Sequence, residues 1–162
     1  AGEDGIQSEI QLADTGYGQG QVLMSALHLA LSYTPLVNGG SMLAPQLEKQ
    51  EGELSAEVWK EQVISKETAD LILGYLIDVV EHPRGTGRDA KISGVTIAGK
   101  TGTAEIKQSQ DDETGTENGW FVAVNTDDPS LLIAMMVEDV KERGGSHYVV
   151  PKVKQVMGDF LR

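Results

Sequence analysis

The chain has 162 residues, 40% hydrophobic and 23% charged, a balance typical of one folded domain with a substantial core. Its net charge of −12 argues against nucleic acid or an anionic membrane as a partner, because both attract basic patches. With no cysteine and three histidines, none paired at ligand spacing, the sequence excludes a disulfide framework and disfavours a zinc site.

The first third of the chain predicts loops around one helix. Residues 1–20 are polar and glycine-rich and predict a loop, serving either the fold alone or a ligand beside it. Ser25 is a typical N-cap, and Pro35 should kink or end the helix that follows. The inner face of this helix is expected to be Leu27, Ala30, Leu31 and Thr34. Residues 41–62 predict a short extended piece and a loop, with Trp59 as a packing anchor.

A second helix should begin after Ser65, with Glu67 near its positive end, and end at Pro83 and Gly85. Its apolar residues recur at helical spacing and predict a buried stripe of Ala69, Ile72, Leu73, Leu76, Ile77 and Val80.

Three strands are predicted next, at Val95–Ile106, Trp120–Asn125 and Leu131–Val137. The acidic stretch Gln108–Asn118 should be a solvated hairpin loop, and Thr126–Pro129 a tight turn. Short connections of this kind favour an antiparallel meander. The last strand is a continuous apolar run, which favours burial on both faces but is far too short to span a membrane.

The C-terminal segment should be a flexible joint at Gly144–His147 and then a helix over 148–162. The apolar face of this helix is expected to be Val149, Val153, Val156, Met157, Phe160 and Leu161. Together these elements predict an α+β domain. It would consist of a loop and helical part over 1–94, sheet strands over 95–138 and the C-terminal helix.

The first predicted strand carries the residues most suited to binding. Lys100 supplies a positive charge, and the hydroxyls of Thr101 and Thr103 can hydrogen-bond an anionic group. Gly102 has no side chain, so a ligand can approach the backbone there. A strand edge of this composition predicts a site that pairs with a peptide and holds its carboxylate.

Lys-Thr-Gly is also the third motif of the serine β-lactamases and penicillin-binding proteins. With the preceding Tyr17-Gly18-Gln19-Gly20, it makes the chain resemble the C-terminal part of a class B penicillin-binding protein transpeptidase domain. The likeness is strongest to the low-affinity, methicillin-resistance type of Gram-positive bacteria. Further matching stretches are Asn38-Gly39-Gly40, Val58-Trp59-Lys60, Ile64-Ser65-Lys66-Glu67, Thr103-Ala104-Glu105, Gly119-Trp120-Phe121 and Asp128-Pro129.

The resemblance implies a fragment of the serine β-lactamase/transpeptidase-like fold, with roles for the matching residues. Lys100 would supply positive potential, Thr101 and Thr103 would bind a carboxylate, and the Thr103 backbone N–H would be an oxyanion donor. Around them, Tyr17 and Gln19 would line the rim, Glu105 would follow the motif and Gly145 would lie on a loop above the site. Purely structural or solvated roles remain open for Tyr17, Glu105 and Gly145.

The resemblance implies a D,D-transpeptidase that cross-links peptidoglycan stem peptides ending in D-Ala-D-Ala, binds β-lactams and uses no metal or cofactor. It would act at the extracytoplasmic face of the bacterial membrane. A β-lactamase or D,D-carboxypeptidase, or a non-catalytic binding domain, would be alternatives.

No serine in the chain has lysine three residues later or asparagine two residues later, although the family's nucleophile motifs require both. In the family these motifs precede the Tyr-Gly-Gln-Gly loop. We therefore expect the 162 residues to need the N-terminal half of the same domain and to be inactive alone.

Overall fold

A computed structural model describes residues 5–19, 22–46, 56–106 and 114–161. Its α-helices are α1 (Glu9–Gly16), α2 (Ala26–Val37), α3 (Lys66–Glu81) and α4 (Val150–Phe160). Its strands are β1 (Met42–Leu43), β2 (Val58–Lys60), β3 (Ile97–Ile106), β4 (Thr116–Asn125) and β5 (Leu132–Val137). Short 3-10 helices cover Arg88–Ala90, Lys141–Arg143 and Gly145–Tyr148. In these residues no helix combines the length and apolar character that crossing a membrane requires.

The predicted α+β fold and antiparallel meander are confirmed. Strands β3, β4 and β5 lie in that order, and the small β1–β2 pair forms a separate sheet. β4 begins at Thr116, earlier than expected, so its hairpin with β3 is longer than the sequence suggested. The predicted acidic loop falls partly on residues 107–113, which lie outside the described residues. At the other end the tight turn is held by Asn125, whose side-chain carbonyl accepts from the N–H of Ser130 and Leu131.

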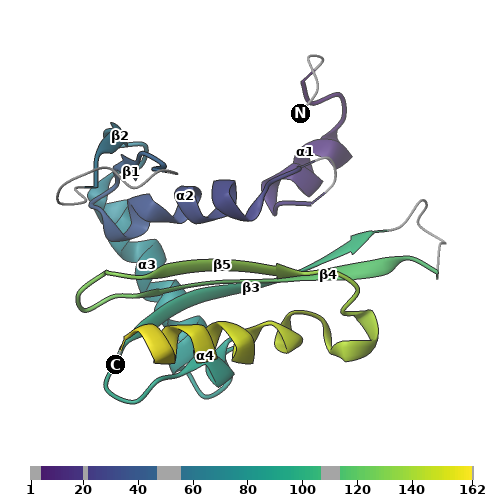
Figure 1. Cartoon of the computed structure of the whole chain (residues 1–162). Coiled ribbons are helices and arrows are strands. Elements are labelled where there is room, and N and C mark those ends of the chain that lie inside the picture. The colour runs from purple at the N-terminus through teal and green to yellow at the C-terminus, as the bar shows by residue number, and fades with distance from the viewer. Residues whose placement is uncertain (1–4, 20–21, 47–55, 107–113, 162) are drawn as a thin grey trace.

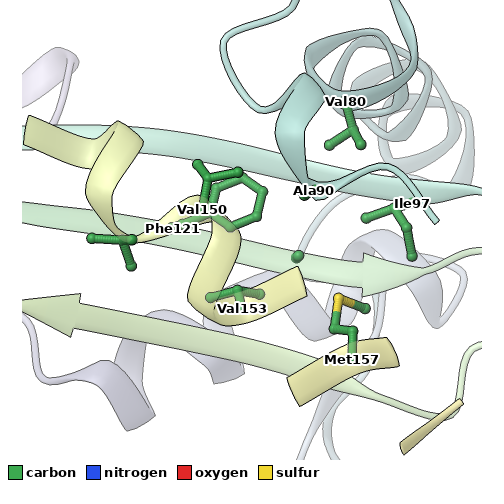
Figure 2. Close-up of a cluster of buried hydrophobic side chains, with 9 residues drawn as sticks. Val80, Ala90, Ile97, Phe121, Val150, Val153 and Met157 are labelled. Atoms are coloured by element: carbon green, nitrogen blue, oxygen red, sulfur yellow. The ribbon is translucent and has the colours of Figure 1, made fainter. Parts of the chain in front are cut away.

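Helices cover both faces of the sheet (Figure 1). The face toward α4 carries the larger cluster, drawn in Figure 2, of Val80, Ala90, Ile97, Phe121, Ala123, Val149, Val150, Val153 and Met157. The opposite face packs against α2 and α3. This cluster contains buried Leu76, Ala98 and Val124, with partly buried Tyr33, Leu36, Val37, Ile72, Leu73, Ile77 and Leu132. The predicted stripe of α3 therefore contributes to both clusters. Because residues of a strand alternate, Thr101 shares a face with Ile97, and Lys100 shares the other with Ala98.

The predicted N-caps Ser25 and Ser65 are confirmed, because their hydroxyls accept from the N–H of His28 and Thr68. The predicted loop over residues 1–20 is wrong, since it contains α1, capped by Ser8. No residue of α1 is buried, so the helix has no apolar stripe by which the sequence could signal it.

Pro35 does not end α2, which continues for two more residues. A proline at this position cannot donate to the Leu31 carbonyl, but the Thr34 hydroxyl donates to that carbonyl at 2.8 Å and satisfies it. Of the predicted inner face only Leu27 is exposed, while Ala30, Leu31 and Thr34 are half-buried. The α2 side chains that pack on the core cluster are Tyr33, Leu36 and Val37. Trp59 is 67% exposed, so its prediction as a packing anchor is wrong.

The segment between β5 and α4 is not a flexible joint. Gly145 and Ser146 are buried in a 3-10 helix that packs on the sheet. The apolar face of α4 is narrower than predicted. Val149, Val153 and Met157 are fully buried, whereas Val156 and Phe160 are exposed. This segment and its packing decide where the C-terminal part of the chain meets β3.

Candidate active site

The lysine motif lies on β3, an edge of the three-strand sheet that the described residues form. Its inner side pairs with β4 in continuous register, with Thr101 opposite Phe121 and Thr103 opposite Gly119. Its outer side is not paired with another described strand. An outer strand edge offers N–H and C=O groups to an extended peptide.

Lys100 projects from the face of the sheet opposite to Thr101, and it is exposed. Its ammonium Nζ donates to the Thr101 carbonyl at 2.7 Å. The cation is therefore held along β3 itself, where it places positive charge at the edge of the sheet.

Thr101 is only 9% exposed, and its Oγ1 lies 2.8 Å from the Oγ1 of Thr86. Thr86 lies after α3, where the sequence predicts only the end of that helix. Its side chain holds the motif threonine from outside the strand. Thr86 is thus a residue of the site that sequence reasoning missed.

Two glycines bring Thr86 to this place. A Cβ at Gly85 would lie 2.2 Å from the Val79 carbonyl oxygen, and a Cβ at Gly87 would lie 3.1 Å from the Phe121 ring. The Gly87 N–H also donates to the Val79 carbonyl at 2.9 Å. The Gly-Thr-Gly triplet after α3 was the available signal, because glycine permits such close approaches of the backbone.

Thr103 is exposed, and its Oγ1 accepts from the backbone N–H of Ser146 at 3.2 Å. The neighbouring Gly145 comes so close that a Cβ there would lie 3.0 Å from the same oxygen. The structure therefore brings the predicted residues Thr103 and Gly145 together, although they are far apart in the sequence.

Gly102 is half-buried, and a Cβ there would meet only the Trp120 side chain, at 3.5 Å. Glu105 is exposed near the end of β3, opposite Glu117. Two carboxyl side chains are therefore neighbours across the strands near the hairpin end of β3, beyond the C-terminal end of the motif that Lys100 begins.

Tyr17 and Gln19 follow directly after α1, the helix that Figure 1 shows on the side of the sheet that carries α2. The Tyr17 hydroxyl donates to the Asp14 carboxylate at 2.8 Å, and that hydrogen bond raises the pKa of Tyr17. The Gln19 N–H donates to the Asp14 carbonyl. In the described residues no hydrogen bond joins either residue to β3, so the structure does not bring them to the motif.

The arrangement suits an anionic, extended ligand. A cation and an exposed hydroxyl lie within four consecutive residues of an outer strand edge, and charge-assisted hydrogen bonds to a carboxylate are among the strongest that proteins make. In the part of the chain that the structure describes, no group of three or more histidine, aspartate or glutamate side chains could hold a metal ion.

Comparison with known proteins identifies the family of the chain. Residues 1–158 match the family model described as the penicillin binding protein transpeptidase domain. The chain belongs to that family. The predicted class B transpeptidase domain is thereby supported by the sequence as a whole and not by the lysine motif alone.

The chain is 53% identical over 152 residues to Penicillin-binding protein 3 of Bacillus subtilis, covering 94% of this chain and 23% of that protein. It is 27% identical to Peptidoglycan D,D-transpeptidase MrdA of Haemophilus influenzae, covering 90% and 25%. The apo transpeptidase domain of Burkholderia pseudomallei penicillin-binding protein 3 shares the fold, with a TM-score of 0.80 at 24% identity, over 96% of this chain and 47% of that one. The chain thus spans about a quarter of the length of the Bacillus subtilis and Haemophilus influenzae relatives.

Proposed function

We propose that the protein containing this chain is a D,D-transpeptidase that cross-links peptidoglycan stem peptides. The observation that carries the proposal is the strand edge where Lys100 and Thr103 present a cation and a hydroxyl, in a chain of the transpeptidase family. A relative named peptidoglycan D,D-transpeptidase aligns with 90% of this chain. A stem peptide ending in D-Ala-D-Ala is an extended peptide with a terminal carboxylate, which is what such an edge suits.

The proposed reaction is acyl transfer through a serine ester. A serine oxygen attacks the carbonyl of the penultimate D-alanine, and the terminal D-alanine leaves with a proton on its amine. An amine of a second stem peptide then displaces the serine. The serine would come from residues outside these 162, because neither nucleophile motif is present in them. No metal or cofactor takes part in the proposal.

In this reaction Lys100 would stabilise developing negative charge, and the backbone N–H of Thr103 would be an oxyanion donor. The Thr103 hydroxyl would bind the substrate carboxylate, the buried Thr101 would support the strand from beneath, and Gly102 would admit the peptide backbone. Glu105 and Gly145 would border the site. The Glu105 carboxylate would repel anionic ligands, which fits an enzyme of low β-lactam affinity. The enzyme would act at the extracytoplasmic face of the membrane.

Intact-mass measurement tests the proposal. The full-length protein incubated with benzylpenicillin should gain the mass of one penicilloyl group on a serine and keep it for long times. A polypeptide of residues 1–162 alone should gain none. Absence of any adduct on the full-length protein would contradict the proposal, and rapid release of hydrolysed penicillin would indicate a β-lactamase instead.

A further inference from the structure

The hydrogen bond from Ser146 to Thr103 fixes a direction for the threonine proton. A backbone N–H can only donate, so the Oγ1 of Thr103 is the acceptor in this 3.2 Å contact. The hydroxyl hydrogen of Thr103 must then point elsewhere. Since the residue is exposed, that hydrogen is available to an acceptor arriving from solvent.

The turn that carries this N–H is fitted closely to the sheet. Gly144 and Gly145 both have left-handed backbone angles, with φ of +90° and +62°. The Gly145 N–H donates to the Val140 carbonyl at 2.9 Å, which anchors the turn. On the sheet, Gly119 lies opposite Thr103, and a Cβ there would come within 3.0 Å of the Gly145 carbonyl oxygen. Glycine at 119 and at 145 therefore lets the Ser146 N–H reach Thr103.

We propose that the Gly145–Ser146 turn is a positioning element that orients the Thr103 hydroxyl as a donor toward the carboxylate of the ligand. The inference rests on the proposed function and adds the residues that set its selectivity for carboxylate-bearing substrates. The Glu117 carboxylate is a competing acceptor near this turn, with its Oε2 3.7 Å from the place of a Gly145 Cβ. In the described structure no hydrogen bond joins it to Thr103.

The two left-handed glycines provide a matched pair of variants. Gly145→Ala adds a methyl group 3.0 Å from the Thr103 Oγ1 and must displace that side chain or lift the turn. Gly144→Ala imposes comparable backbone strain, but its methyl group meets nothing within 4 Å. Each variant of the full-length protein is acylated with benzylpenicillin, which carries a carboxylate, and with benzylpenicillin methyl ester, which does not.

Losing one donor to a charged group should slow acylation by benzylpenicillin roughly tenfold or more in Gly145→Ala, with little change for the methyl ester. Gly144→Ala should change both rates by the same factor. Thr103→Val should likewise slow acylation by benzylpenicillin but not by the methyl ester. Thr103→Ser keeps the hydroxyl and should retain most of the wild-type rate with benzylpenicillin. Equal slowing of acid and ester in Gly145→Ala, or the same pattern in Gly144→Ala, would overturn the inference. If the wild-type protein is acylated by neither compound, the proposed function fails, and the inference fails with it.

Discussion

The hydroxyl pair of Thr86 and Thr101 allows a prediction with a definite asymmetry. Thr101 is 9% exposed, whereas Thr86 is exposed, and their oxygens are 2.8 Å apart. Thr86→Val keeps the side-chain shape but leaves a buried hydroxyl without its partner, which costs about 1–3 kcal/mol. Thr101→Val leaves the exposed Thr86 hydroxyl to water, so it should cost about 1 kcal/mol or less. The double variant should then be close to Thr101→Val, so the coupling energy should equal the Thr86→Val cost, about 1–3 kcal/mol.

Urea denaturation of the full-length protein measures these differences from the midpoint of the transition in which this domain unfolds. Thr126→Val is a suitable control. The Thr126 hydroxyl donates to the Thr96 carbonyl at 3.2 Å, but that carbonyl also accepts the Thr126 N–H at 3.0 Å and stays satisfied. Additive effects of Thr86→Val and Thr101→Val, or a Thr86→Val effect no larger than the control, would refute the reasoning.

Three further predictions concern charge, pH and association. Lys100→Ala should slow β-lactam acylation of the full-length protein about 100-fold in stopped-flow measurements without changing its melting temperature, because the side chain is exposed. The pKa of Glu67 is lowered from 4.5 by hydrogen bonds from the backbone N–H of Glu67 and from the Ser65 hydroxyl. The ionised carboxylate therefore stabilises the folded state above pH 4.5, and this stabilisation is lost as the pH falls. Glu67→Gln should reduce that loss. A polypeptide of residues 1–162 should associate, because β5 pairs only with β4 among the described strands; a concentration-independent monomer in sedimentation, with protected amides at 132–137, would contradict this.

Local signals predicted the elements whose residues carry a repeating pattern. Ser65 with the apolar stripe of α3, and the three antiparallel strands in their predicted order, appear as expected. The α1 helix escaped because none of its residues is buried, so no hydrophobic period marks it. The packing of Trp59 was mispredicted because hydrophobic character alone does not say which side chains find neighbours.

The site shows the same limit. The composition of β3 pointed to Lys100 and Thr103 as ligand groups, since their chemistry is written in the sequence. What holds them is tertiary. In the sequence, Thr86 precedes the three sheet strands and Ser146 follows them. Each reaches the motif because neighbouring glycines allow the backbone to approach closely. No local pattern encodes such a contact, although a glycine beside a polar residue is a hint.

These outside contacts matter for the chemistry that β3 is suited to. The Lys100 ammonium, the Thr101 hydroxyl and the Thr103 hydroxyl each have a hydrogen-bond partner within the protein. A polar group that is already held does not have to be ordered when a ligand binds, so less of the binding free energy is spent on that ordering. Stabilisation of developing charge likewise depends on dipoles that are in place before reaction. The ability of the motif to bind a ligand and stabilise charge therefore depends on the turn after α3 and on the turn before α4, as well as on its own residues.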